Sequence, residues 1–238
     1  MIGCHCSVCT SVDFRDQRLR TSVHLDINGK SLVIDTGPDF RQQILRERIT
    51  KLDAAIFTHE HKDHTAGLDD VRGFNYSQKK YMDVYARSNV LTHLKTEFYY
   101  AFGNHKYPGA PDITLHEIGN QPFEIEGITI TPIEAYHYKL PVFGFRIGDF
   151  TYLTDVNFIS EVEQQKIMGS KVIVLNGLQR EFHISHYTFD EAVALLKKWQ
   201  PEKGFLTHIS HRLGLHTEVE KELPAWLRLA YDGLKVEV

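Results

Sequence analysis

The fold of this 238-residue chain is decided by the stretch Thr58-His59-Glu60-His61-Lys62-Asp63-His64. Four groups that can bind a metal ion fall close together here, in the pattern His-x-His-x-Asp-His. The apolar run at 52–57 comes just before it and predicts a buried strand, while the residues from Thr65 onward can begin a helix. The donors therefore lie on a strand-to-helix loop at the edge of a sheet.

The geometry of an extended chain divides these donors into two pairs. If the loop stays extended through His61, side chains two apart point the same way, so His59 and His61 can grip one ion. Asp63 and His64 follow after the chain turns, which suits a second ion close by. The chain has 14 histidines, so chance clustering is the alternative. The added Asp-His directly after a strand argues against chance.

Composition places the chain among ordinary globular proteins, with 42% hydrophobic and 24% charged residues. Its length allows one large domain or two tightly joined halves. The formal charge of −4 provides no global basic field for nucleic acid or for an anionic membrane. We find no apolar run of membrane-spanning length and no signal pattern at the N-terminus, so we expect a cytoplasmic location.

All three cysteines lie in the N-terminal stretch Gly3-Cys4-His5-Cys6-Ser7-Val8-Cys9. An odd number of cysteines this close together in the sequence does not favour disulfide bonds. The C-x-C-x-x-C spacing favours three thiolates on one zinc ion that still lacks a fourth ligand. Free thiols at a frayed terminus are the alternative.

The pattern of the remaining chain predicts two packed sheets with helices outside them. Two apolar alternating runs flank Asn28-Gly29, a strong hairpin signal. Residues 39–48 have helical spacing, with Phe40, Ile44 and Leu45 on one face. We expect further strands at 81–86, across 113–154, at 171–176, 204–207 and 235–238, and helices at 89–102, 158–168, 189–199 and after a cap at Thr217.

Three more donors each come at the end of a predicted apolar strand: His137, Asp155 and His208. A layered fold places its active-site rim at such strand ends. Taken singly, each is more simply a surface histidine or a turn aspartate. Together with the central motif they complete a set of seven donors for two metal ions, with Asp155 able to bridge both through its two carboxylate oxygens.

The order of these seven donors closely resembles that of the metallo-β-lactamase superfamily. The resemblance covers almost the whole chain from Leu32 onward and implies one domain, residues 1–238, with the four-layer αββα sandwich of an α/β protein. It also implies which ligands share an ion. One metal would take His59, His61 and His137, the other would take Asp63, His64 and His208, and Asp155 would bridge them.

Within the superfamily the chain resembles the phosphodiesterase branch, and there the cyclic phosphodiesterases of the carbon–phosphorus lyase pathway. The similarity is carried by the Gly-Cys-x-Cys-x-x-Cys start, by Gly67-Leu68-Asp69-Asp70-Val71-Arg72 and by His183-x-x-His186-x-Thr188. Members of this branch have a first strand before the cysteines. Because the chain begins at Met1-Ile2-Gly3-Cys4, we expect either that the sequence is truncated before this point or that the first strand is absent.

The resemblance also suggests residues that act on a phosphate. His186 would touch or protonate a phosphate oxygen beside the N-terminus of the helix at 189–199, and Asp63 joins it as a catalytic candidate. His183 and Arg72 are weaker substrate-binding candidates. The alternatives are a loop histidine with Thr188 as a helix cap, and a solvated helix residue at Arg72.

The leading interpretation is a hydrolase in which a metal-bound hydroxide cleaves small or cyclic phosphodiesters. A tRNA 3′-processing endoribonuclease is one alternative, but no basic insertion for gripping tRNA is seen. A lactonase or thioesterase is another and would need an apolar acyl pocket, for which Phe98, Tyr99, Tyr100 and Phe102 are candidates. A di-iron redox protein and a non-catalytic relative fit less well, because all seven donors are histidine or aspartate and none is lost.

The donor chemistry leaves the active-site metals open between zinc, manganese and iron. We expect a small phosphodiester as substrate, no stable nucleic-acid partner and no membrane, and the residues leave a homodimer open. For the cysteines, the branch implies His211 as the fourth ligand of a structural zinc, with His5 as a rival that a short chelate would strain.

Overall fold

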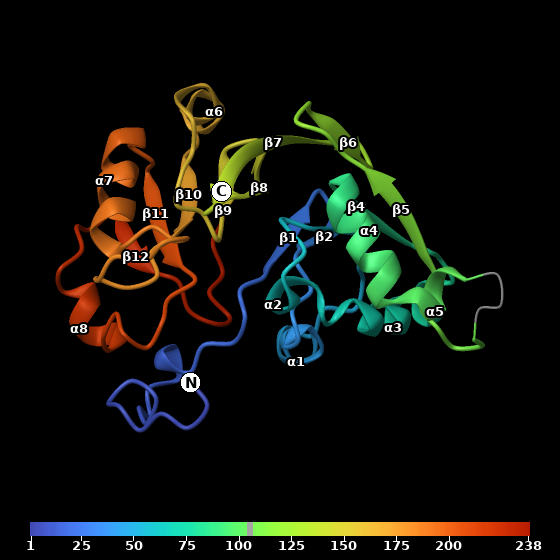
Figure 1. The fold of residues 1–238 in the computed structure, drawn as a ribbon, viewed down its shortest axis with the longest axis horizontal. Coiled ribbons are helices and arrows are strands. Elements are labelled where there is room, and N and C mark those ends of the chain that lie inside the picture. Colours follow the sequence, from blue (N-terminus) through green and yellow to red (C-terminus); the bar gives the residue numbers. More distant parts are fainter. Residues whose placement is uncertain (104–106) are drawn as a thin grey trace. The chain divides into compact units, whose positions relative to one another are not determined.

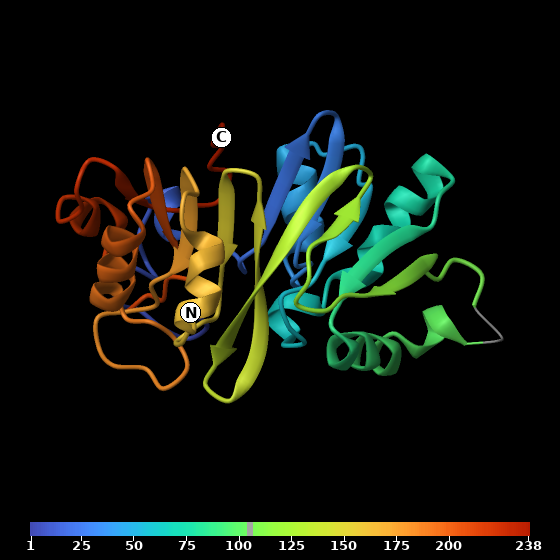
Figure 2. The ribbon, with the colours of Figure 1, turned by 90° about the horizontal axis from the view of Figure 1, so that it is seen from above.

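The computed structural model describes residues 1–103 and 107–238. The chain divides into two compact units. The continuous unit is Arg20–Ile128, and the discontinuous unit combines Met1–Leu19 with Thr129–Val238. Figure 1 and Figure 2 show a sheet with its helices in each of them.

The continuous unit is built on a five-stranded sheet of order β1-β2-β3-β4-β5. The first pair is antiparallel and the following pairs are parallel. Its strands are β1 (Val23–Ile27), β2 (Lys30–Ile34), β3 (Ala54–Ile56), β4 (Met82–Ala86) and β5 (Ile113–Glu117), and β6 (Phe123–Ile125) follows them. Its helices are α1 (Phe40–Glu47), α2 (Lys62–Thr65), η2 (Leu68–Val71), α3 (Arg72–Gln78), α4 (Ser88–Glu97) and α5 (Tyr99–Phe102).

The predicted hairpin is confirmed. Asn28 and Gly29 have φ values of 52° and 74°, the left-handed pair that a tight two-residue turn requires. One face of the resulting sheet packs on the helices, because alternate strand residues such as Val33 and Val84 point into the same core as Phe40 of α1. This packing fixes where β2 and β3 end, and hence where the motif loop begins.

Three details of the continuous unit differ from the sequence prediction. Leu45 is 65% exposed, because in a helix it lies about 140° around the axis from Phe40, whereas Ile44 lies close to Phe40. The helix after the motif begins at Lys62, inside the donor cluster, rather than at Thr65. The helix predicted at 89–102 is broken at Phe98, whose φ of −105° and ψ of 37° are not helical.

The discontinuous unit carries the remaining sheet, with its strands in the order β12-β11-β10-β9-β8-β7. β7, β8 and β9 are antiparallel neighbours, and β9, β10, β11 and β12 are parallel. The strands are β7 (Ile128–His137), β8 (Leu140–Ile147), β9 (Phe150–Leu153), β10 (Val172–Asn176), β11 (Lys203–Thr207) and β12 (Leu227–Leu229). The helices are η1 (Phe14–Asp16), α6 (Glu161–Ile167), α7 (Phe189–Trp199) and α8 (His216–Glu220).

The parallel strands of this unit bring the polar residues that follow them to one edge of the sheet. Asp155 lies just beyond β9 and His208 just beyond β11. Between them, Asn176 at the end of β10 holds the chain after Asp155, since its side chain accepts from the Val156 N–H at 2.9 Å and donates to the Val156 carbonyl at 3.0 Å. The core under this edge joins sheet residues such as Leu175 to Leu196 of α7.

The C-terminal part differs from the sequence prediction in two places. Thr217 is not a cap, because α8 already begins at His216, and the His216 N–H donates to the carboxylate of Asp16 at 2.8 Å. A residue 200 positions away thus replaces the local cap. The strand predicted at 235–238 is absent from these described residues. The edge position next to β11 is taken by β12, whose Leu227 and Leu229 are buried.

The helix predicted at 158–168 begins only at Glu161, where Ser160 caps it by accepting from the Glu163 N–H. Phe158 instead forms an isolated bridge with Tyr136.

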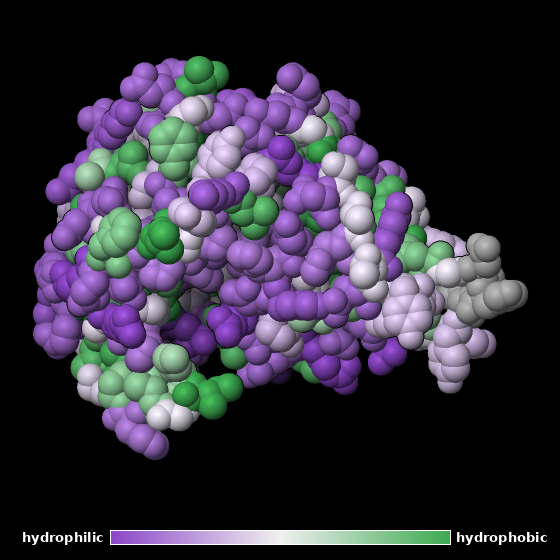
Figure 3. Space-filling model, viewed as in Figure 1, coloured by the Kyte–Doolittle hydropathy of each residue, from purple (hydrophilic) through white to green (hydrophobic). Residues whose placement is uncertain are grey.

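No helix in the described part of the chain is both long and apolar enough to cross a membrane. The face drawn in Figure 3 is mainly hydrophilic, with apolar residues in small groups.

Candidate functional site

The motif loop points two histidines at each other. Nε2 of His59 lies 3.1 Å from Nδ1 of His61, and the other nitrogen of His59 lies 2.9 Å from the hydroxyl of Thr58. The chain is still extended at His61 (φ −61°, ψ 146°), which is why the two side chains share a side. The separation of the facing nitrogens is close to the roughly 3.3 Å expected for two ligands of one tetrahedral zinc ion.

His64 is oriented by a residue that the sequence analysis missed. Its Nδ1 lies 2.7 Å from Oδ2 of Asp35, and both side chains are buried. Asp35 also accepts from the N–H and the hydroxyl of Thr58, at 2.9 and 2.8 Å. Nε2 of His64 in turn lies 3.8 Å from Asp63. Histidines that bind metals are commonly held in this way through their second nitrogen.

The backbone at Asp35 is strained, a feature that only the structure shows. Its φ of 63° is left-handed, a conformation that costs free energy for a residue with a side chain. Glycines at 37 and 67 allow the segment after β2 and the segment after the motif to lie close together. A Cβ on Gly67 would overlap the carbonyl of Gly37. The Gly67 N–H donates to the Thr36 carbonyl at 2.8 Å and so joins the ends of β2 and the motif segment.

The discontinuous unit holds a second group of donors at its strand ends. Oδ1 of Asp155 lies 3.0 Å from Nε2 of His208 and 3.7 Å from Nδ1 of His186. Asp155 and His208 both have left-handed backbones, with φ values of 56° and 51°. Strain of this kind at two strand ends indicates that the side chains must point in a particular direction.

His137, the last residue of β7, joins this second group. Its Nδ1 lies 2.8 Å from the carbonyl oxygen of Ser185, so Nε2 is the ring nitrogen that would bind a metal ion. Its ring is 4.6 Å from that of His186, and one ligand atom each from His137, Asp155 and His186 lie within 4.8 Å of one another. The structure thus brings His186 as close to the donors as a ligand would be.

His186 is a neutral imidazole at neutral pH in this environment. Burial lowers its pKa to about 3, and the opposing attraction of Asp155 does not compensate. Its Nδ1 is buried without a hydrogen-bond partner among the residues that the structure describes. His183 stands beside it, with 4.9 Å between the rings, and contacts Ser185.

The N-terminus of α7 is not free to take a phosphate, contrary to the sequence interpretation. Thr188 caps it by accepting from the Glu191 N–H, and the Glu191 carboxylate accepts from the Thr188 N–H at 2.8 Å in return. The Phe189 N–H donates to the Gln179 carbonyl. Asp190 and Glu191 also place two carboxylates in the first turn, which repel an anion. The predicted capping role of Thr188 is confirmed.

The N-terminal cysteines gather around the predicted fourth ligand. Ligand atoms of Cys4, Cys6, Cys9 and His211 lie within 4.8 Å of one another, and Nδ1 of His211 is 3.4 Å from the sulfurs of Cys4 and Cys6. The N–H of Cys9 lowers the pKa of Cys6 to about 6, which favours the thiolate that zinc requires. His5 is exposed and lies outside this group. Three sulfurs and one imidazole fit a structural zinc site.

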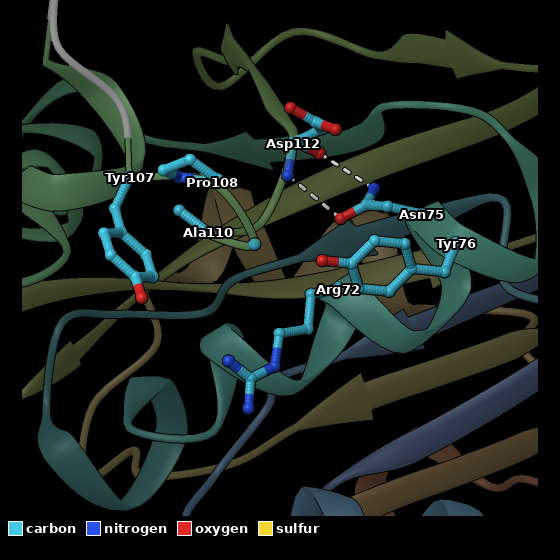
Figure 4. A pocket seen from close by; sticks show the side chains of 8 residues that line it. Arg72, Asn75, Tyr76, Tyr107, Pro108, Ala110 and Asp112 are labelled. Atoms are coloured by element: carbon cyan, nitrogen blue, oxygen red, sulfur yellow. Dashed lines mark hydrogen bonds between the residues drawn. The ribbon is translucent and has the colours of Figure 1, made fainter.

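Arg72 lies apart from the motif donors. Its guanidinium pairs with Asp69 at 3.4 Å, and it borders a cavity of about 220 Å³ within the continuous unit (Figure 4). Tyr76 and Tyr107 line the same cavity, and Asn75 closes it through hydrogen bonds with Asp112. None of the four motif donors lines it. These contacts favour a solvated helix residue over a phosphate ligand.

Three of the four aromatic residues suggested for an acyl pocket pack in or against the core instead. Phe98 is 5% exposed and packs in the core of the continuous unit together with Tyr100 and Phe102. The hydroxyl of Tyr100 donates to Asp69 at 2.6 Å. Tyr99 points to solvent. The packing of these side chains therefore does not support the acyl-pocket interpretation of this stretch.

The His-x-His-x-Asp-His motif and the donors that follow it agree with the result of a comparison with known protein families. A family model described as a β-lactamase superfamily domain matches residues 30–209. The chain belongs to the metallo-β-lactamase superfamily. This confirms the predicted αββα fold class and makes the chain a hydrolase of that fold, one that binds divalent metal.

Relatives of this metallo-β-lactamase protein differ in their named activities. The crystal structure of a new diphosphatase from the PhnP family superposes with a TM-score of 0.93 at 37% identity and covers 99% of this chain and 90% of that one. This confirms the resemblance to the phosphodiesterase branch. An octanoyltransferase of Porphyromonas gingivalis is 38% identical over 98% of this chain but only 48% of its own length, so the chain spans about half of that relative. A ribonuclease Z of Staphylococcus epidermidis is 29% identical over 48% of this chain and 38% of its own length.

Imidazole nitrogens and carboxylate oxygens on strained strand ends are the ligands that zinc, manganese and iron accept. The continuous unit carries such side chains at His59, His61, Asp63 and His64, and the discontinuous unit carries them at His137, Asp155 and His208. Asp35, Asn176 and Ser185 support them. The sequence analysis proposed the donors but did not include these supporting residues.

Proposed function

We propose that this protein is a dinuclear metal-dependent phosphodiesterase that acts on small or cyclic substrates. The observation that supports this most is the hydrogen bonding of three donor histidines. His59, His64 and His137 each have one ring nitrogen held by a hydroxyl, a carboxylate or a carbonyl. Such bonds set the direction of the other nitrogen, as in metal-binding histidines generally.

The order of the donors supports an assignment to two ions. His59, His61 and His137 would hold one, Asp63, His64 and His208 would hold the other, and Asp155 would bridge them. Bound divalent ions would polarise the phosphoryl group and activate water at neutral pH. Zinc, manganese and iron are all compatible with this set.

The residues of the chain have separate tasks in this proposal. Asp35 orients His64 across 2.7 Å, so this ring is fixed before the substrate arrives, and Asp155 and His208 face each other across 3.0 Å, as two ligands of one ion would. His186 is neutral because burial lowers its pKa, and it therefore holds a proton on only one ring nitrogen. That N–H can donate to a non-bridging or a departing phosphate oxygen.

The named activity of the diphosphatase relative suggests how far the substrate class extends. In a diphosphate that is esterified at both ends, each phosphorus carries two bridging oxygens and one negative charge. A phosphodiester presents the same arrangement at its single phosphorus. The proposed class therefore includes disubstituted diphosphates as well as open and cyclic phosphodiesters.

Acyl transfer is the second candidate, because the octanoyltransferase relative matches nearly the whole of this chain. That similarity leaves the other half of the relative without a counterpart, so the octanoyl activity need not belong to the shared half. Phe98 and Tyr100, which would have lined an acyl pocket, are packed in the core. Cleavage of tRNA ranks lower, because the net charge of −4 disfavours a long polyanion.

The test is a substrate panel with purified protein reconstituted with zinc or manganese. The panel contains a bis-aryl phosphodiester, a 2′,3′-cyclic nucleotide, a dinucleoside diphosphate, a lactone, an octanoyl thioester and a precursor tRNA. We expect turnover of the diesters and little action on the corresponding monoesters. If the lactone or the thioester reacted far faster than every diester, acyl chemistry would replace the proposed function.

A further inference from the structure

Three large apolar side chains of the discontinuous unit stay exposed around the donor His137. Tyr138 is 50% exposed, and Phe158 and Ile184 are each 55% exposed. We call Tyr138, Phe158 and Ile184 the aromatic rim. Each of these side chains leaves about half of its surface exposed, and exposed apolar residues that are grouped in this way mark a site of interaction more often than scattered ones do.

The rim is held together by the side chain of Asn157. Its Oδ1 accepts from the Tyr138 N–H at 2.8 Å, and its Nδ2 donates to the Ile184 carbonyl at 3.0 Å. The Tyr136 N–H donates to the Phe158 carbonyl at 2.9 Å. The carbonyl of Ser185, the residue after Ile184, accepts from Nδ1 of His137. One set of hydrogen bonds therefore positions both the donor and the rim.

Tyr138 has a backbone that a tyrosine avoids. It is the first residue of the two-residue turn between β7 and β8, and its φ is 58°. A turn with a left-handed first position normally has glycine there, because a side chain raises the free energy of that conformation. Among the described residues, no other tyrosine, phenylalanine or tryptophan has a positive φ. A ring kept at such a cost indicates that the ring itself is used.

Lys139 completes the feature. Its ammonium group lies 5.3 Å from the centre of the Tyr138 ring. An aromatic face and a cation thus meet at the tip of one hairpin, next to the donor His137. This pairing suits an anion that carries a flat organic group.

We propose that the aromatic rim recognises the nucleobase of a nucleoside esterified to the scissile phosphate. The inference rests on the proposed phosphodiesterase function and names its substrate class. Tyr138 stacks on the base and is a positioning residue for the substrate, and Lys139 faces the phosphate charge. The reaction itself stays with the donors and His186.

A base fits the rim better than an acyl chain does. An alkyl chain gains most when it is enclosed on all sides, as in a deep apolar pocket. The rim is open, and its half-exposed rings offer a flat face, which is enough for stacking. The 220 Å³ cavity lies in the continuous unit and contains no rim residue.

Two diesters with the same leaving group test the inference: thymidine 5′-para-nitrophenyl phosphate and methyl para-nitrophenyl phosphate. Both release the same phenolate, so only the nucleoside differs. We expect Tyr138→Gly to raise KM for the thymidine ester by about tenfold, as the loss of one stacking ring would. Its KM for the methyl ester should stay within about twofold, and kcat for the methyl ester should not change, since the ring does not touch the reacting atoms.

Control variants distinguish a loss of base recognition from a general loss of folding. Tyr138→Gly should keep or raise the melting temperature, because glycine relieves the left-handed backbone. Tyr138→Phe should behave like the natural protein, and Tyr99→Ala, at an exposed tyrosine of the continuous unit, should change neither ester. Equal losses on both esters, or no loss on either, would overturn the inference while leaving the phosphodiesterase function in place. If the unaltered protein cleaved neither ester, the proposed function and this inference would both fall.

Discussion

Asp35 and His64 form a buried pair in which Oδ2 of the carboxylate lies 2.7 Å from Nδ1 of the imidazole. The two residues are 29 positions apart, one after β2 and the other in the motif, and the same carboxylate also holds Thr58. The pair sets the orientation of a proposed ligand before any ion is bound. Its removal should therefore affect metal affinity before it affects the fold.

Asp35→Asn tests this pair, because asparagine tolerates the left-handed backbone but offers a weaker hydrogen-bond partner to His64. We expect the affinity for zinc or manganese to fall by about 10- to 100-fold, with little change in the melting temperature. Isothermal titration of the metal-free protein measures it. Asp26→Asn, at an exposed strand position, is the matched control. An unchanged affinity would show that the carboxylate has no supporting role.

Asp155→Ala should abolish phosphodiester turnover and reduce the metal content while the chain stays folded. The carboxylate is buried beside His208 and His186, and Asp155 is the one acidic residue between the end of β9 and the start of α6. Metal analysis and circular dichroism on the same sample measure both effects. Asp149→Ala, which removes only a surface pair with Lys171, should leave activity and metal content unchanged. Full activity of Asp155→Ala would refute the bridging assignment.

His186→Ala separates a catalytic role from a ligand role. If its N–H serves a phosphate oxygen, kcat should fall by about 100-fold, as for other hydrogen-bond donors to developing charge, and the metal content should stay constant. A lower metal content would make His186 a ligand, as its distance to Asp155 also allows. Unchanged kinetics would leave it as a structural loop residue.

The cysteine cluster predicts one zinc ion per chain that is independent of the active-site metals. Cys6→Ser and His211→Ala should each lose that ion and lower the melting temperature, because the site ties the N-terminus to the segment after β11. Zinc stoichiometry and thermal unfolding measure this. His5→Ala, at an exposed position outside the cluster, should change neither. If both ligand variants kept the ion, the site would not exist as described.

Gly67→Ala should destabilise the motif segment, because the new methyl group would overlap the Gly37 carbonyl and crowd Phe40. We expect a loss of about 1–3 kcal/mol in the free energy of unfolding, typical of overpacking. Gly73→Ala is the control, since it lies in α3 with no atom within 4 Å of the added Cβ. It should instead stabilise the protein by about 1 kcal/mol through helix propensity. Urea unfolding of both variants checks the contrast.

The sequence predicted the donor positions well because each follows an apolar strand, and strand ends can be read from local pattern. His137, Asp155 and His208 lie at the ends of β7, β9 and β11 as expected. The hairpin at Asn28 and the helix α7 were equally local signals, and both are confirmed.

What the sequence could not reveal depends on contacts between distant residues. Asp35 reads as a turn aspartate, because nothing local shows that His64 will lie against it. Thr217 reads as a helix cap because the true partner of that helix end is Asp16. Leu45 reads as a core residue because a short helix allows more than one choice of buried face.

The division of the chain also has a consequence for how the protein is made. The continuous unit, Arg20–Ile128, has all its residues as soon as the ribosome has passed residue 128. Cys4, Cys6 and Cys9 are synthesised about 200 residues before His211, which completes their cluster. We therefore expect the cysteine segment to carry free thiols until His211 has left the ribosome. Zinc capture would follow that step, and oxidation of the waiting thiols would be its main competitor.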